Sequence, residues 1–188
     1  PVVLGLPPAI RGAVLGGSSL LGRRLIASAQ GLTGYPVPNV SVQWQVKSAG
    51  RWVSIPDATS ARWRSTATYA ARIVRARIVA SNEAGPPAKR FTPTTIIQAA
   101  PLPPQQVQAV AMGKRITVTW SKAVPRGSKV TGYDVTCALG SAAKVSHVSG
   151  RSTASRLVVA RAGRYTCQVA ADSLAGRTRS ARVTVVVG

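Results

Sequence analysis

The sequence predicts an all-β protein made of two tandem β-sandwich domains. Turn-forming residues, 17 Gly and 13 Pro, are spread along all 188 residues with short alternating stretches between them. Regularly spaced strands with such punctuation are typical of a sandwich or barrel. Apolar residues make up 45% of the chain but include only one Phe and one Met. The cores must therefore be built from Val, Ile, Leu, Ala and a few Trp and Tyr, a composition that favours strands.

In the first half, the stretch from Ala70 to Ala80 can be read either as a helix or as a strand. As a strand it places Arg75 and Arg77 on one face and four apolar residues on the other: Val74, Ala76, Ile78 and Ala80. As a helix it would spread its arginines around the cylinder. Because the stretch ends at a turn over residues 81–85, we predict a strand.

The second half has the clearest alternation. Apolar and polar residues alternate over residues 116–120, 133–137, 157–159 and 165–171, with turn residues between these runs. This pattern predicts a seven-stranded sandwich.

Several stretches of this half resemble the fibronectin type III domain of bacterial secreted proteins. They are Pro103–Val107, Ile116–Trp120, Val130–Cys137 and Gly163–Ala171, and the likeness extends over roughly residues 101–187. The resemblance implies that Trp120, Tyr133 and Tyr165 lie in the core.

The first half resembles bacterial immunoglobulin-like repeats over about residues 9–98. The stretches that carry the likeness are Leu21–Ser28, Gly34–Gln45, Trp52–Ser60 and Ile73–Gly85. Where that family usually has Tyr-Gln-Trp-Gln, this chain has Val42-Gln-Trp-Gln, and it lacks the strand B and F cysteines of antibody domains. We expect Trp44 to pack in the core without a disulfide.

These likenesses divide the chain into four parts. Residues 1–8 are an N-terminal extension or linker, 9–98 an immunoglobulin-like sandwich, 99–104 a proline-rich linker, and 105–188 a fibronectin type III-like sandwich. Prolines remove donors from a sheet, so the linker is expected to be extended and semi-rigid.

The two cysteines, Cys137 and Cys167, both lie in the core-facing register of their strands. In the fibronectin-like topology these strands are neighbours, at a separation that allows a disulfide after modest adjustment. A disulfide would imply an oxidising compartment. The alternative is a pair of buried free thiols.

Charge is the most unusual feature of the composition. The chain contains 25 Lys and Arg residues but only four acidic residues, which gives a net charge of +21. Such a chain attracts polyanions and repels copies of itself, unless neighbouring chains supply the missing acids. No apolar run is long enough to span a membrane.

Arginines repeat with one residue between them, so that on a strand each pair shares a face with a spacing of about 6.5 to 7 Å. This spacing suits successive phosphates or carboxylates, which arginine can bind bidentately. The predicted contact residues are Arg62, Arg64, Arg72, Arg75, Arg77, Arg177 and Arg179. Trp63, between Arg62 and Arg64, faces the other side and is expected to be core. The alternative is a solvated outer face that protects sheet edges.

No catalytic constellation is recognisable. The acids are scattered, His147 is the only histidine and is expected on an exposed strand or loop, and one His with two separated Cys cannot form an ordinary zinc site. We predict no enzyme activity, no metal and no cofactor.

The leading hypothesis is a structural and interaction module outside a bacterial cell, in a homo- or hetero-oligomeric assembly, bound to an anionic surface polymer or to acidic subunits. The alternatives are a phage decoration or tail protein in the virion and the accessory domains of a larger secreted enzyme. Sequence-specific nucleic-acid binding is not expected, because no recognition helix or known motif occurs.

Overall fold

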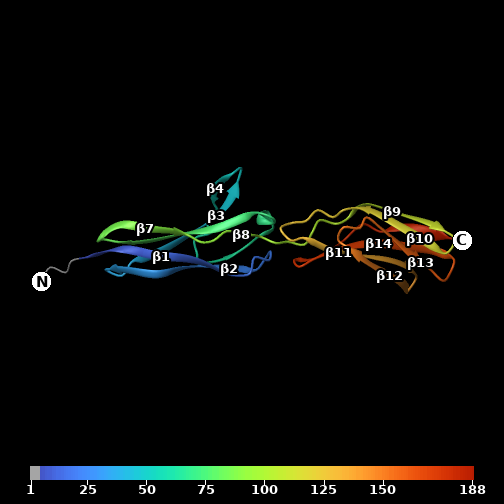
Figure 1. The fold of residues 1–188 in the computed structure, drawn as a ribbon, viewed down its shortest axis with the longest axis horizontal. Helices are drawn as coiled ribbons and strands as arrows, with labels where there is room; N and C mark the ends of the chain where they lie inside the picture. The colour runs from blue at the N-terminus through green and yellow to red at the C-terminus, as the bar shows by residue number, and fades with distance from the viewer. Residues whose placement is uncertain (1–4) are drawn as a thin grey trace. The chain divides into compact units, whose positions relative to one another are not determined.

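A computed structural model describes residues 5–188, and their regular secondary structure is almost entirely antiparallel strand. The chain divides into two compact units, Pro1–Gln98 (unit 1) and Ala99–Gly188 (unit 2) (Figure 1). Over the described residues the helical content is one short 3-10 helix, η1 (Ala67–Tyr69), and none of their helices could cross a membrane. The prediction of two tandem all-β sandwiches is confirmed.

Unit 1 packs a three-stranded sheet against a five-stranded sheet. The first sheet has the order β1 (Leu6–Gly17), β2 (Arg24–Tyr35), β5 (Arg62–Arg64). The second has the order β4 (Arg51–Ser54), β3 (Asn39–Ser48), β6 (Ile73–Asn82), β7 (Gly85–Phe91), with β8 (Thr95–Ile96) also paired to β6.

Unit 2 repeats this strand order. Its three-stranded sheet is β13 (Ala154–Val158), β10 (Arg115–Ser121), β9 (Gln105–Met112). Its second sheet is β12 (Ala142–Ser149), β11 (Val130–Leu139), β14 (Gly163–Ser173), β15 (Gly176–Arg179), with β16 (Val183–Val187) also paired to β14.

The core of unit 1 is centred on Trp44, which is fully buried and donates from its indole nitrogen to the Ser60 carbonyl oxygen at 2.9 Å. Trp63 packs against it, with 5.4 Å between ring centroids. Strand β6 buries Val74, Ala76, Ile78 and Ala80 and turns its arginines outward, so the prediction of a strand here is confirmed.

The core of unit 2 contains Trp120, Tyr133 and Tyr165, each at most 5% exposed. The Tyr133 hydroxyl accepts a hydrogen bond from the Ala123 amide at 2.9 Å. The Tyr165 hydroxyl donates to the Arg161 carbonyl oxygen, also at 2.9 Å. Both tyrosines therefore fix loops as well as filling the core.

Two segments that the sequence analysis placed outside the domains are parts of them, as far as they are described. Residues 6–8 begin β1, and Leu6 pairs with Tyr35 of β2 before a register shift that ends at Ala9, while residues 1–4 of the expected extension lie outside the described residues. Residues 99–104 belong to unit 2 rather than to a free linker. Ala99 pairs with Arg126, the Leu102 amide donates to the Val124 carbonyl oxygen at 2.9 Å, and Pro101 and Pro104 are fully buried. These hydrogen bonds and the burial of the two proline rings together hold this segment to the sandwich.

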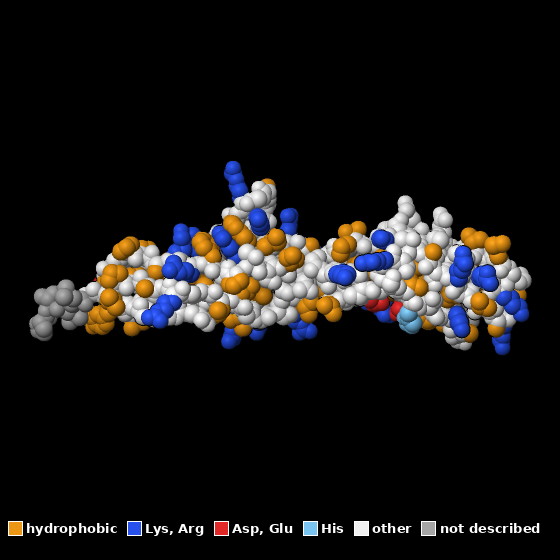
Figure 2. All heavy atoms as spheres, in the orientation of Figure 1, with side chains coloured by type: hydrophobic (Ala, Val, Ile, Leu, Met, Phe, Trp, Pro, Cys, Tyr) orange, Lys and Arg blue, Asp and Glu red, His pale blue; other side chains and the backbone are white. Residues whose placement is uncertain are grey.

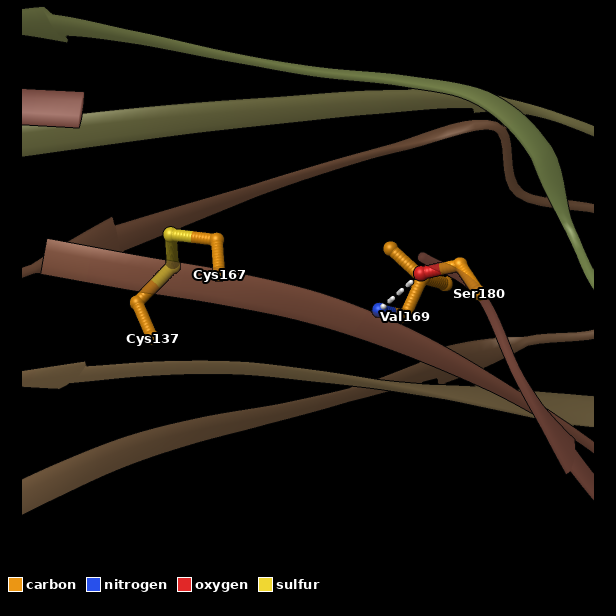
Figure 3. The surroundings of a disulfide bond; sticks show 4 residues. All are labelled: Cys137, Cys167, Val169 and Ser180. Carbon is orange, nitrogen blue, oxygen red and sulfur yellow. Dashed lines mark hydrogen bonds between the residues drawn. A yellow bond between two sulfur atoms is a disulfide. The ribbon is translucent and has the colours of Figure 1, made fainter. Parts of the chain in front are cut away.

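The last strand of each unit is interrupted at one hydroxyl residue. In unit 2, between β15 and β16, the Ser180 amide donates to the Val169 carbonyl oxygen at 2.8 Å, and the Ser180 hydroxyl accepts from the Val169 amide at 3.1 Å (Figure 3). In unit 1, Thr92 lies between β7 and β8 and makes the same two hydrogen bonds to Ala76, at 2.9 and 3.0 Å. The side chain thus replaces the carbonyl of a regular ladder and lets the strand change course.

Candidate anion-binding faces

The predicted contact arginines lie on three separate strands, except Arg72, which lies outside them. Arg62 and Arg64 are exposed on β5, in the three-stranded sheet of unit 1, whereas Arg75 and Arg77 lie on the outer face of the opposite sheet. Arg72 is exposed just before β6, and the remaining pair lies on β15 of unit 2. Because the sheets of a sandwich turn their outer faces away from a shared core, the arginines of unit 1 do not form one continuous site.

The arginines of β5 lie among like charges. Arg64 faces Arg24 across the β2–β5 pair, and its Nε donates to the Gly22 carbonyl oxygen at 2.7 Å. Trp63, between the two arginines, packs against the core cluster of unit 1 instead of lying on the surface. This strand therefore presents cations without an adjoining aromatic platform.

Arg75 is held between two aromatic rings. Its guanidinium carbon lies 4.1 Å from the ring centroid of Trp52 on β4 and 3.8 Å from that of Phe91 on β7. Its Nε donates to Gln45 Oε1 on β3 at 3.0 Å. Burial lowers the pKa of the Arg75 guanidinium from its ordinary value, yet the group stays charged near neutral pH because arginine starts so high. The result is a fixed, partly desolvated cation.

Arg77 lies two residues further along the same strand and directly opposite Phe91. Its Nε is buried and has no hydrogen-bond partner among residues 5–188. No ion pair links Arg75 or Arg77 to an acid in the part of the chain that is described. The charge of both groups is thus uncompensated within unit 1.

Arg177 is already paired within unit 2. Its guanidinium binds Asp172 at 2.5 Å and Asp134 at 2.6 Å. The hydrogen bond to Asp172 is the main reason that the pKa of Arg177 is raised. With two carboxylates beside it, Arg177 is not a free anion-binding group, in contrast to the role expected of it from the sequence.

The single histidine lies in the same cluster. His147 Nδ1 contacts Asp134 Oδ1, and the His147 side chain is 76% exposed. Figure 2 shows the histidine next to acidic atoms on the visible face of unit 2, while Lys and Arg side chains are spread over both units. The described residues contain no group of three or more His, Cys, Asp or Glu arranged to hold a metal ion.

Arg179 lines a groove with two further arginines on the outer face of the five-stranded sheet of unit 2. The groove has a volume of about 570 Å³ and contains no acid. Its lining comprises Thr136, Ala138, Gly140, Arg164, Thr166, Gln168, Arg179 and Arg182. Arginines provide charge and forked donors, while the Thr and Gln side chains provide neutral hydrogen-bonding groups. This arrangement is suited to an anion with several oxygen acceptors.

The disulfide and Ser180, both drawn in Figure 3, lie next in sequence to residues that line the groove. Cys137 and Cys167 face each other on β11 and β14 and form a disulfide, with 4.0 Å between their Cα atoms. Side chains alternate across a strand, so the neighbours of the two cysteines point outward into the groove. Ser180 and Ala181 lie between Arg179 and Arg182, and Gln168 Nε2 donates to the Ser180 carbonyl oxygen at 2.8 Å.

Sequence reasoning missed the members of these sites that lie far apart along the chain. Trp52, Phe91 and Gln45 come from strands other than that of Arg75, and nothing in their spacing connects them. Arg164 could have been found, because it alternates with Tyr165 and Cys167 and must point outward. It carried no Arg-x-Arg signal and was not included in the predicted set.

No protein-family model matches this chain, and no curated protein matches it. Among solved structures, the FN1–FN3 domains of chicken CNTN1 align at a TM-score of 0.46 and 19% identity, covering 97% of this chain and 69% of that one. The chicken interferon gamma receptor alpha chain aligns at 0.45 and 13%, covering 96% and 98%. Both TM-scores are low, so the fold assignment depends on the strand order and cores described above.

Proposed function

We propose that this chain is a non-enzymatic structural and interaction module of an extracellular bacterial surface or filament assembly, whose basic faces contact an anionic polymer or acidic partner subunits. The observation that carries the proposal is the groove formed by Arg164, Arg179 and Arg182. Three guanidinium groups line it with no acid among them, although acids are available elsewhere on the same unit and neutralise Arg177. Such an array gains from an external anion.

An extracellular location is supported by the disulfide, which forms and persists in oxidising compartments. The Cys137 and Cys167 side chains are fully buried, which is typical of a structural rather than a reactive disulfide. A role as a spacer is consistent with two successive sandwiches in one chain, each with its own core.

The groove is tested by binding to heparin, used as a soluble linear polyanion, over a range of NaCl concentrations. Arg164→Ala/Arg179→Ala removes two groove cations, and Arg115→Ala/Arg156→Ala removes two exposed cations from the opposite sheet. Binding to a polyanion releases counterions, so log K falls as log salt rises. On the scale for single-stranded nucleic acids, each lost contact should make this slope less steep by roughly 0.7. We expect this change in the groove variant alone. Equal slopes in the two variants would show that net charge alone drives binding.

The assembly part of the proposal is tested by electron microscopy of material isolated from its source at near-physiological salt. Ordered filaments or layers that contain this chain are the expected result. Dispersed monomers at the same salt would refute an assembly role and leave the groove as a binding site of a free protein.

A further inference from the structure

We propose that the outer face of the five-stranded sheet of unit 1 is a separate docking site for an acidic peptide segment in extended conformation. This surface, called here the Arg75 face, consists of Lys47, Trp52, Arg75, Arg77, Lys89 and Phe91. The proposal depends on no property of the groove in unit 2 and can hold or fail independently of it.

The register of the sheet places these side chains on one surface. Trp52 is paired with Lys47 across β4 and β3, and Arg77 is paired with Phe91 across β6 and β7. Opposed residues share a face, and so do residues two apart on one strand. Gln45 lies two residues before Lys47 and opposite Arg75. Its hydrogen bond to Arg75 connects the residues on β3 and β4 with those on β6 and β7.

The stack restricts how Arg75 can bind a partner. Trp52 and Phe91 both pack against the guanidinium, and Gln45 accepts a hydrogen bond from its Nε. The remaining donors are the terminal nitrogens, which make no hydrogen bond to another residue of the described chain. Because this guanidinium is already held in place, it loses little conformational freedom when a partner binds. It offers its terminal edge to a planar acceptor such as a carboxylate.

The spacing of the cations fits an extended peptide. Arg75 and Arg77 are separated by one residue on β6, which corresponds to about 6.5 to 7 Å, and alternate side chains of an extended peptide repeat at the same distance. Acidic residues at every second position could therefore face both arginines at once. Lys47 and Lys89 flank them, and Lys89 Nζ lies 5.9 Å from the ring centroid of Phe91.

Charge complementarity points to a partner rather than to this chain. Asp57 and Glu83 are the acids of unit 1, and neither forms an ion pair with the Arg75 face within the described residues. The buried, unpartnered Nε of Arg77 leaves its charge poorly compensated, so an external carboxylate gains more here than at a well-hydrated cation.

The test uses the whole chain and two labelled octapeptides of equal composition, measured by fluorescence anisotropy. One peptide alternates Glu and Thr, and the other has its Glu residues in one block. We expect the alternating peptide to bind several-fold more tightly. Arg75→Lys keeps the charge but loses the fork and the stack, and it should weaken binding of the alternating peptide about tenfold. Arg62→Lys, on the opposite sheet, should change it less than about twofold.

Three results would overturn the proposal. Equal binding of the two peptides would indicate that net charge, and not the spacing of the carboxylates, determines affinity. An unchanged affinity in Arg75→Lys would exclude a role of the stacked arginine in peptide binding. Absence of peptide binding, together with binding of polygalacturonate or polyphosphate that Arg75→Lys weakens, would assign the face to a different anion. If circular dichroism shows that Arg75→Lys is misfolded, Phe91→Leu takes its place, because it removes one ring without a change of charge. An unchanged affinity of Phe91→Leu for the alternating peptide would then exclude the stack.

Discussion

Replacing the disulfide of unit 2 should destabilise that unit and leave unit 1 unchanged. The substitution Cys137→Ala with Cys167→Val removes the cross-link and keeps apolar side chains at two fully buried positions. The bridge joins residues 30 apart in sequence, and for a loop of that length the chain-entropy relation gives about 3.5 kcal/mol.

The assay is hydrogen exchange followed by mass spectrometry, because it reports the two units separately in one molecule. A loss of about 3.5 kcal/mol corresponds to exchange that is a few hundredfold faster for the most protected amides of β11 and β14. Amides of β3 and β6 in unit 1 are the internal reference. Acceleration below about tenfold in unit 2, or equal acceleration in both units, would refute the reasoning.

Two further predictions concern single side chains. Ser180→Ala removes the acceptor of the buried Val169 amide, and Thr92→Val removes that of the buried Ala76 amide. Each substitution should therefore lower the free energy of unfolding of its own unit by about 1 to 3 kcal/mol. Hydrogen exchange would measure this loss, and a loss shared between the two units would contradict the prediction. Arg177→Met removes the cation beside Asp172 and leaves Asp134 with only its His147 contact, and both carboxylates stay partly solvated. It should therefore cost less than about 1 kcal/mol. The raised pKa of Arg177 means that its contribution is complete below its ordinary pKa and is lost only above it. The Arg177→Met difference in urea midpoint should therefore be constant from neutral pH up to about pH 10, and a difference that disappears in this range would exclude the ion pair as its cause.

The fold was predictable because its signals are local. Period-two alternation in β6 and β14 identifies a buried face without knowledge of the partner strands. The same alternation turns Arg75, Arg77 and Arg164 outward. Domain edges were less predictable, since proline suggests a linker whether its ring is solvated or buried. Pro101 and Pro104 are fully buried, and the segment is bonded to Val124 and Thr178, which are distant in sequence.

The candidate binding surfaces were only half predictable, since the composition of each depends on strand pairing. Arg177 and Arg179 look equivalent on the chain, yet β14 and β11 bring Asp172 and Asp134 to the first and Arg164 to the surroundings of the second. The stack around Arg75 requires β4 and β7 to lie on opposite sides of β3 and β6. An Arg-x-Arg spacing reports which arginines share a face but not whether an acid or a ring lies beside them.

The interrupted last strands have a further consequence for crowded copies of the chain. An edge strand that is long and straight can pair with the sheet of another molecule and start aggregation. In this protein the last strand is divided into pieces of 7 and 2 residues in unit 1 and of 4 and 5 residues in unit 2. Each piece offers few consecutive hydrogen-bonding groups, so at this edge of each five-stranded sheet another molecule has little to extend. Concentrated copies of the chain are therefore protected from pairing through this edge.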